Sequence, residues 1–304
     1  MIADQVDVSV ILPVYNEAGH LQDEVERIQH ALDQSSYTYE ILIVDDGSSD
    51  ESGGVAESLD GVRVIRFATN RGSGSARKYG TMAAVGNVVV WTDVDMTYPN
   101  DTIPELVTEL NGYDQVVGSR KTEEGTVKLL RMPAKWFIRN LASYLSRTDI
   151  PDLNSGFRAF RREVGEQFLY LLPRGFSCVT TLTMAFLSNG YSIKYVPIDY
   201  APRAGRSKFH WWRDTQRYLL QVVRMVLTHE PIRFFGPPAA VFVGLGLAKL
   251  AYDLMTKSFR VGTNTIVILG IGFALAALGL ITDLTVQLNK RQNDVMPSTV
   301  RGDD

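Results

Sequence analysis

The sequence is poor in the residues that form disulfide bonds or bind zinc. Its 304 residues include one cysteine, Cys178, and four histidines. A single cysteine excludes an internal disulfide bond and agrees with a reducing compartment. The histidines, at positions 20, 30, 210 and 229, lack the spacing of a zinc site. We therefore expect neither a disulfide framework nor bound zinc.

The sequence also lacks a strong charge of one sign and a leader at its start. Thirty-one basic and 34 acidic residues give a formal net charge of −3. This balance argues against a general nucleic-acid-binding protein, which is usually basic. Residues 1–7 are polar and contain no apolar stretch with a cleavage site. We therefore expect that the globular part is not exported.

Two long apolar stretches are present near the C-terminus. They cover Pro237–Leu254 and Thr265–Leu284, and each is close to the roughly 20 residues that cross a bilayer as a helix. Lys249 and Asp253 lie near enough to the end of the first stretch to pair or to reach the interface. Two membrane spans are the simpler interpretation, and a hairpin of two buried helices is the alternative.

Basic residues flank these two stretches more densely than they occupy the loop between them. The loop contains Lys257 and Arg260, whereas the flanks contain Lys208, Arg213, Arg217, Arg224, Arg233, Lys290 and Arg291. Positive residues remain on the cytoplasmic side of a membrane. The pattern predicts a multi-pass protein of the plasma membrane with both termini in the cytoplasm.

The segment Trp211–Leu227 has the pattern of an amphipathic helix. Arg213, Arg217 and Arg224 fall in one narrow stripe of a helical wheel, and apolar residues fall on another face. A basic amphipathic helix with tryptophans, placed just before a membrane span, is typical of a helix that lies in the membrane interface. An ordinary helix packed on the globular domain is the alternative.

The first two hundred residues alternate between apolar strands and helices. Strands are predicted at 8–13, 39–44, 63–67, 88–92, 114–118, 155–160 and 192–197, and helices at 18–34, 74–85, 127–146, 162–171 and 180–189. Thr102 and Glu105 have the spacing of a capping box at a further helix start. Continuous apolar strands between helices predict an α/β fold with a mostly parallel sheet covered on both faces.

Two acidic residues, Asp93 and Asp95, directly follow the predicted strand 88–92. Side chains one residue apart point to opposite faces of an extended chain, so both can meet one ion only if the backbone turns. Carboxylates suit Mg²⁺ or Mn²⁺, which prefer hard oxygen ligands. The alternative is that these acids cap the next helix or are solvated.

Polar loops follow two other predicted strands. Residues 13–17 follow the first strand, and the acidic and serine-rich residues 45–50 follow the second. Ligands of parallel sheets bind beyond the carboxyl ends of the strands, so we expect these loops and the acidic pair to form one site. Gly72 and Gly74 do not form a dinucleotide-binding fingerprint, because Arg77 stands where the third glycine is needed.

Six short motifs together resemble family 2 glycosyltransferases of the GT-A fold, specifically the polyprenyl-phosphate (dolichyl-phosphate) sugar transferases. The resemblance covers essentially the whole chain. Its motifs are VILPVYNE at 10–17, VDDGSSD at 44–50, NRGSG at 70–74, DVD at 93–95, NSGFR at 154–158 and RAGRSK at 203–208. Each motif is weak alone, and the six in this order are specific.

The resemblance implies a role for each matching residue. Contacts to the nucleotide sugar would come from Pro13, Tyr15, Glu17, Val44, Asp46 and Val94. Asp93 and Asp95 would hold a divalent cation on the diphosphate. Arg120, Arg203 and Lys208 would bind phosphates of the donor or the acceptor, since an arginine side chain can bind phosphate oxygens with two parallel hydrogen bonds.

The pattern leaves alternatives open for two features of this site. Arg131, Lys135 and Arg139 recur every four residues and share one helix face; with Ser207 they could bind the acceptor phosphate, or the row could face solvent or lipid headgroups. Many relatives have glutamine where this chain has Thr97. A threonine hydroxyl is a weaker metal ligand, so water could take that coordination position.

The sequence thus predicts a GT-A catalytic domain at 1–208, an interface helix at 209–230, a transmembrane hairpin at 231–290 and a cytoplasmic tail at 291–304. The predicted reaction is inverting, metal-dependent transfer of one hexose from a UDP- or GDP-sugar to a polyprenyl or dolichyl monophosphate. A glycolipid or polysaccharide acceptor is the nearest alternative, and a catalytically silent nucleotide-sugar-binding scaffold is another. Expected partners also include the lipid bilayer and a second copy of the chain.

Overall fold

The computed structural model describes residues 6–120, 150–175, 177–201, 223, 227, 231–256 and 260–294. The chain divides into two compact units, residues 1–222 and 223–304. The predicted basic helix at 127–146 and the predicted interface helix at 209–230 lie outside the described residues, apart from positions 223 and 227.

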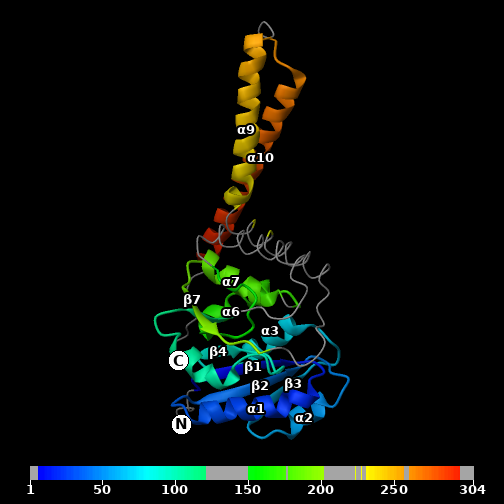
Figure 1. Ribbon diagram of the computed structural model, residues 1–304, viewed down its shortest axis with the longest axis vertical. Helices are drawn as coiled ribbons and strands as arrows, with labels where there is room; N and C mark the ends of the chain where they lie inside the picture. The colour runs from blue at the N-terminus through cyan, green and yellow to red at the C-terminus, as the bar shows by residue number, and fades with distance from the viewer. Residues whose placement is uncertain are drawn as a thin grey trace. The chain divides into compact units, whose positions relative to one another are not determined.

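The first unit is built on a seven-stranded sheet with the order β3-β2-β1-β4-β6-β5-β7 (Figure 1). Its strands are β1 (Val8–Val14), β2 (Tyr39–Asp45), β3 (Val62–Arg66), β4 (Val88–Trp91), β5 (Gln115–Arg120), β6 (Arg158–Arg161) and β7 (Ile193–Ile198). Only β6 is antiparallel to its neighbours, β4 and β5. The prediction of a mostly parallel sheet is confirmed.

Helices cover both faces of this sheet, as Figure 1 shows. The described residues of the first unit form the helices α1 (Ala18–Asp33), α2 (Ser52–Ser58), α3 (Ser73–Ala83), α4 (Ile103–Thr108), α6 (Arg162–Glu166) and α7 (Cys178–Ser188), with short 3₁₀ turns at Asn100–Thr102 and Leu169–Leu171. The predicted helix at 162–171 is therefore divided into α6 and a 3₁₀ turn.

The alternation of side chains along β1 explains the two-faced core. Val8, Val10 and Leu12 belong to the cluster that packs against α1 and α4. The intervening Ile11 points to the other face, where a β-carbon on Gly80 of α3 would lie 2.4 Å from its Cγ2. Each alternate residue of a strand faces the opposite side of a sheet, so both faces of this strand are apolar, except at Ser9, whose hydroxyl donates to Glu40.

The predicted capping box at the start of α4 is wrong. Thr102 occupies the N-cap position, but its side chain makes no capping hydrogen bond. Its hydroxyl instead donates to the carbonyl of Pro99 at 2.8 Å. The preceding 3₁₀ turn brings that carbonyl within reach of the hydroxyl, so a local turn contact replaces the cap.

The second unit contains two long apolar helices, α9 (Pro231–Thr256) and α10 (Thr263–Asp294). In each, 26 residues are apolar enough to cross a membrane, and they extend for about 39 Å at 1.5 Å per residue. The helices pack closely at glycines: a β-carbon on Gly246 would lie 2.6 Å from Leu269. Asp253 accepts hydrogen bonds from the Gly262 amide and the Thr265 hydroxyl, at 2.9 and 2.5 Å, and so joins the two helices near their connection.

Candidate functional site

Six strands run in the same direction, because β1, β2, β3 and β4 pair in parallel, β5 and β7 pair in parallel, and β6 reverses direction twice between β4 and β5. Their carboxyl ends therefore share one edge of the sheet. The loops after β1, β2, β4, β5 and β7 all begin there. The sequence prediction of converging polar loops agrees with this arrangement.

The acidic pair sits on a tight turn after β4. Met96 has a φ of 60°, a left-handed conformation that costs a side-chain-bearing residue about 1–2 kcal/mol. This residue turns the backbone directly after Asp95, at the end of the acidic pair. Val94, between them, is 2% exposed and packs in the core, which holds the turn against the sheet.

Asp95 is held by its neighbour Thr97. The Thr97 hydroxyl donates to Oδ1 of Asp95 at 2.5 Å and the Thr97 amide donates to the same oxygen at 3.3 Å. Asp95 is only 7% exposed and Thr97 1% exposed. In this arrangement Thr97 orients the carboxylate, and its predicted role as a metal ligand stays a prediction.

Asp93 is held by a residue that sequence reasoning did not assign to the site. Nη2 of Arg77, on α3, lies 2.6 Å from Oδ1 of Asp93. The Arg77 guanidinium is buried and lies 5.8 Å from the ring of Trp91. Burial acts to lower the pKa of Arg77, but the charge of Asp93 and the adjacent Cys178 thiol outweigh it and raise the pKa. A permanent cation therefore neutralises one of the two acids.

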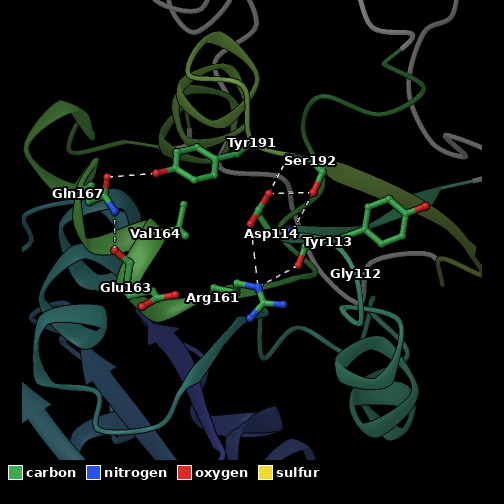
Figure 2. A pocket seen from close by; sticks show the side chains of 9 residues that line it. All are labelled: Gly112, Tyr113, Asp114, Arg161, Glu163, Val164, Gln167, Tyr191 and Ser192. Carbon is green, nitrogen blue, oxygen red and sulfur yellow. Dashed lines mark hydrogen bonds and ion pairs between the residues drawn. The ribbon is translucent and has the colours of Figure 1, made fainter. Parts of the chain in front are cut away.

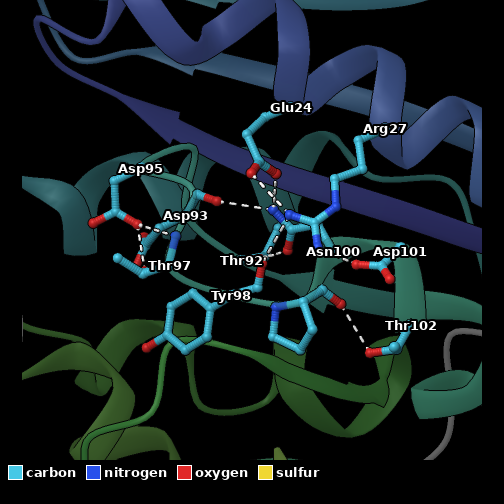
Figure 3. Close-up of polar contacts among 11 residues, drawn as sticks. Glu24, Arg27, Thr92, Asp93, Asp95, Thr97, Tyr98, Asn100, Asp101 and Thr102 are labelled. Carbon is cyan, nitrogen blue, oxygen red and sulfur yellow. Dashed lines mark hydrogen bonds and ion pairs between the residues drawn. The ribbon is translucent and has the colours of Figure 1, made fainter. Parts of the chain in front are cut away.

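A buried polar network lies behind the same turn (Figure 3). Oδ1 of Asn100 accepts from the Thr92 hydroxyl at 2.5 Å, and its amide nitrogen donates to the Asp93 carbonyl at 3.1 Å. The same nitrogen donates to Glu24 of α1. Burial raises the pKa of Glu24, although Asn100 and Arg27 oppose that shift.

The loops after β1 and β2 are tied to each other. The Asn16 amide donates to the Ser48 hydroxyl at 3.1 Å, and Oδ1 of Asn16 accepts from the Ser49 amide at 2.8 Å. The Glu17 amide donates to the Ser52 hydroxyl at 2.9 Å. The predicted nucleotide contacts Tyr15 and Glu17 therefore lie in a segment with a fixed backbone, beside the predicted contact Pro13.

Asp46, another predicted nucleotide contact, is engaged with the backbone. Its two carboxylate oxygens accept from the Arg71 and Gly72 amides, at 2.6 and 2.8 Å. Burial raises its pKa, and these two amides oppose the shift. Val44 is fully buried, with its side chain directed at Gly80. In this structure Asp46 holds the loop before α3, and Val44 packs against α3. Their direct contacts with a nucleotide stay predictions.

The start of α3 is closed by another segment of the chain. The Arg174 carbonyl accepts from the Gly74 and Ser75 amides, at 2.8 and 3.3 Å. A β-carbon on Gly74 would lie 2.0 Å from the Pro173 carbonyl oxygen, and one on Gly72 would lie 2.3 Å from the Arg174 oxygen. These glycines thus permit two backbones to meet. The amides of Gly74 and Ser75 donate within the protein, so they do not form a phosphate-binding loop here.

Arg120 ends β5 and is paired with Asp152. Its Nε and Nη2 donate to the two carboxylate oxygens at 2.7 and 2.9 Å, and its guanidinium lies 5.3 Å from the ring of Tyr200. Burial acts to raise the pKa of Asp152, but the hydrogen bonds and charge of Arg120 outweigh it and lower the pKa. This pairing fixes the plane of the guanidinium at the edge of the sheet.

The segment that enters β6 reaches the acidic turn. The Gly156 amide donates to the Tyr98 hydroxyl at 2.8 Å, and a β-carbon on Gly156 would lie 3.0 Å from Oδ2 of Asp93. Next to it, Arg158 is fully buried and donates to the Ser155 and Val179 carbonyls and to the Thr183 hydroxyl. Burial lowers the pKa of Arg158 to about 10.

The donor set suits a hard divalent cation that carries a phosphate. Among the described residues, no group of three or more His, Cys, Asp and Glu side chains could enclose a metal ion. Mg²⁺ is commonly bound by one or two carboxylates, with water and substrate phosphates as its other ligands. Asp93 and Asp95 fit that arrangement, and they do not fit an all-protein metal cage.

A separate pocket lies at the opposite, amino-terminal ends of β5 and β7 (Figure 2). Within it, Asp114 accepts from the Ser192 amide and hydroxyl, both at 2.8 Å, and lies 4.0 Å from Nε of Arg161. Tyr191 donates to Gln167 at 3.3 Å. These groups bind each other, and the pocket lies at the edge of the sheet opposite the acidic pair.

Several predicted phosphate-binding residues lie outside the described residues. They are Arg131, Lys135, Arg139, Arg203, Ser207 and Lys208. Ala201, which precedes the last three in the sequence, is described, and its amide donates to the Thr97 carbonyl at 2.9 Å.

Comparison with known proteins gives consistent matches. Residues 9–169 match the family described as Glycosyl transferase family 2. The chain is 36% identical over 237 residues to a dolichol-phosphate mannosyltransferase from Pyrococcus furiosus, covering 72% of this chain and 63% of that protein's length. It is 30% identical over 248 residues to an undecaprenyl-phosphate 4-deoxy-4-formamido-L-arabinose transferase from an Enterobacter species, covering 79% and 73%.

A solved structure shares the fold. Glucosyl-3-phosphoglycerate synthase from Mycobacterium tuberculosis, crystallised with Mn²⁺ and uridine-diphosphate-glucose, superimposes with a TM-score of 0.58 at 20% sequence identity. The match covers 73% of this chain and 79% of that one. The predicted GT-A fold is thereby confirmed.

Proposed function

Because the chain belongs to glycosyl transferase family 2, we propose that it transfers one hexose from a nucleotide sugar to a polyprenyl monophosphate, with inversion at the anomeric carbon. Two observations support this activity. The relatives named above act on dolichol phosphate and undecaprenyl phosphate. The chain also has two apolar helices long enough to cross a membrane, which would keep it beside a lipid acceptor.

The observation that carries the proposal is the position of two oriented acids at the carboxyl end of β4. Asp93 is held by the buried cation Arg77, and Asp95 accepts hydrogen bonds from Thr97. Both carboxylates follow the strand at the edge of the sheet where the polar loops converge, and there they would hold a cation carried by a diphosphate. When bound there, Mg²⁺ or Mn²⁺ would act as a Lewis acid and stabilise the departing nucleoside diphosphate by several kcal/mol.

The other nucleotide contacts would come from the loops after β1 and β2. Pro13, Tyr15, Glu17, Val44, Asp46 and Val94 match the family motifs, and the first three precede the fixed start of α1. The ties between Asn16 and Ser48, and between Glu17 and Ser52, would keep these loops in place while a base and ribose bind. Such prior ordering reduces the entropy that binding must overcome.

A phosphate acceptor simplifies the chemistry. Transfer to a hydroxyl needs a general base near the working pH. By analogy with phosphorylated side chains, a phosphomonoester loses its second proton at a pKa of about 6, so it would attack at neutral pH without such a base. The protein would have to orient it and screen its repulsion from the donor diphosphate.

Basic residues would perform that screening. Arg120 is oriented by Asp152 at the edge of the sheet, and Arg203 and Lys208 follow Ala201, whose amide bonds to the acidic turn. We assign these three to phosphates of the donor or the acceptor, and Arg131, Lys135, Arg139 and Ser207 to the acceptor phosphate.

The basic residues that flank the two apolar helices give the orientation in the membrane. Both termini would lie in the cytoplasm.

The test of this proposal compares Asp95→Ala with Asp23→Ala, an exposed acid on α1. Purified variants are given a labelled UDP- or GDP-hexose, Mn²⁺ and a short-chain polyprenyl phosphate. Loss of several kcal/mol of stabilisation predicts transfer at least about 100-fold slower for Asp95→Ala, with Asp23→Ala unchanged. Chelation with EDTA should have the same effect as Asp95→Ala. Full activity after either treatment would refute the role of the metal.

A further inference from the structure

Asn100 is completely buried and all of its described side-chain hydrogen bonds concern the acidic turn or its support. Its Nδ2 donates to the Asp93 carbonyl at 3.1 Å and to a Glu24 carboxylate oxygen. Its Oδ1 accepts from the Thr92 hydroxyl at 2.5 Å. One side chain therefore joins the last residues before the turn to helix α1 (Figure 3).

The far end of the turn is tied to the same helix. Nη1 of Arg27 donates to the Tyr98 carbonyl and to Oε1 of Glu24, each at 3.3 Å. The backbone at positions 93 and 98 is thus held on α1 through two neighbouring side chains. Glu24 is fully buried, so its carboxylate has little alternative to these partners.

Between these anchors lies the strained residue Met96, with φ at 60°. A strained turn persists only when its surroundings determine it. Release of the Asp93 carbonyl would allow residues 93–96 to relax, and the two carboxylates would then change their separation. A metal site tolerates only about 0.5 Å of such error in its ligands.

We propose that Asn100 is a positioning residue, which holds the Asp93 carbonyl so that the Asp93 and Asp95 carboxylates are spaced for a divalent cation carried by a nucleoside diphosphate. This inference rests on the proposed function. Asn100 does not touch the cation; it acts through the backbone of Asp93. Asparagine suits the position because its two N–H groups meet two acceptors and its oxygen meets one donor.

The test measures metal binding rather than turnover. The purified full chain is titrated with Mn²⁺ in the presence of UDP or GDP. The concentration of free Mn²⁺ is measured at each step by electron paramagnetic resonance. Binding of the nucleotide alone is measured in EDTA. The variants are Asn100→Ala and, as a reference, Asp114→Asn, which loses a partly buried, hydrogen-bonded negative charge at the opposite edge of the sheet (Figure 2).

We expect Asn100→Ala to bind Mn²⁺ with the nucleotide at least about 10-fold more weakly, which corresponds to about 1.4 kcal/mol, with nucleotide affinity in EDTA unchanged. Asp114→Asn should retain the Mn²⁺ affinity of the unmodified chain, even if it lowers the melting temperature as much as Asn100→Ala does. Thr92→Val removes the donor to Oδ1 of Asn100 and should weaken Mn²⁺ binding severalfold; it decides the question if Asn100→Ala does not fold.

Unchanged Mn²⁺ affinity in a folded Asn100→Ala, or in Thr92→Val where Asn100→Ala does not fold, would overturn the inference. Equal weakening in Asp114→Asn would also overturn it, because the effect would then follow stability alone. Failure of the unmodified chain to bind Mn²⁺ with either nucleotide would instead contradict the proposed metal-dependent function.

Discussion

Nη2 of Arg77 lies 2.6 Å from Oδ1 of Asp93, so a buried cation on α3 holds one acid of the pair that follows β4. The ion pair connects the helix that packs on β1 and β2 with the turn that would carry a metal.

Arg77→Met should destabilise the protein strongly. Removal of one partner from a buried ion pair costs about 3–5 kcal/mol. Because the Asp93 side chain is 32% exposed, we expect a loss near the lower end of that range. The free energy of unfolding by urea, followed by tryptophan fluorescence, measures it. Arg63→Met removes a half-exposed arginine from Glu40, which keeps hydrogen bonds from the Ser9 hydroxyl and the Val85 amide, and should cost at most about 1 kcal/mol. Equal losses for the two variants would contradict the assignment.

Thr97→Val should weaken binding of Mn²⁺ with UDP or GDP about 10-fold. A hydrogen bond to a charged group contributes about 1.5–3 kcal/mol, and valine preserves the shape of threonine without its hydroxyl. Isothermal titration calorimetry checks the affinity. Thr97→Ser keeps the donor to Oδ1 of Asp95 and should bind nearly as well as the unmodified chain. Weakening by serine as large as that by valine would exclude the hydroxyl as the cause.

Gly74→Ala should destabilise the first unit. The new methyl group would lie 2.0 Å from the Pro173 carbonyl oxygen, and overpacking of this kind costs about 1–3 kcal/mol. Gly19→Ala in α1 is the matched control, since nothing lies within 4 Å of its added β-carbon; it should be neutral or stabilise the helix by up to about 1 kcal/mol. Thermal denaturation compares them. A tolerated Gly74→Ala would show that the two backbones are not in close contact.

The Arg120–Asp152 pair should make stability fall at acid pH. The pKa of Asp152 in the folded protein lies below its ordinary value of 3.8. The unfolded chain therefore takes up a proton first as the pH falls, and the stabilisation, complete above 3.8, is lost through the folded pKa. The difference in unfolding free energy between the unmodified chain and Asp152→Asn should be constant near neutral pH and shrink below 3.8. A difference that grows on acidification would contradict this sign.

The loop between α9 and α10 should be outside the cell. In a chain that carries Cys178→Ala, the added variant Arg260→Cys should react in intact cells with a maleimide that cannot cross membranes. The variant Asp23→Cys, at an exposed position, should react only after the cells are lysed. The labelled fraction is measured by the mass shift of the protein. The opposite pattern would reverse the orientation predicted from the basic residues.

The sequence was sufficient for the strands and for the edge at which the site lies. The apolar run from Val8 to Val14 and the acids after Trp91 are local patterns, and the carboxyl ends of parallel strands necessarily share an edge. The direction of β6 was not predictable in the same way, because its four residues are a local pattern compatible with either direction. Only its position between β4 and β5 shows that it is antiparallel.

The supporting residues of the site were missed for a physical reason. Arg77 is 16 residues from Asp93, and Asn100 is 76 residues from Glu24. Such partners are brought together by the packing of α3 and α1 on the sheet, which no local pattern records. Arg77 attracted notice only as the residue that breaks a glycine fingerprint.

The most direct test of the proposed activity is the mass of the product. The purified chain is incubated with Mn²⁺, a panel of UDP- and GDP-hexoses and a short-chain polyprenyl monophosphate, without other proteins, and the lipid fraction is analysed by mass spectrometry. We predict a polyprenyl phosphate that has gained one hexose, with one nucleoside diphosphate released for each product molecule. A lipid of unchanged mass with every nucleotide sugar, while glycolipid or polysaccharide acceptors in a parallel incubation gain the sugar, would contradict the account.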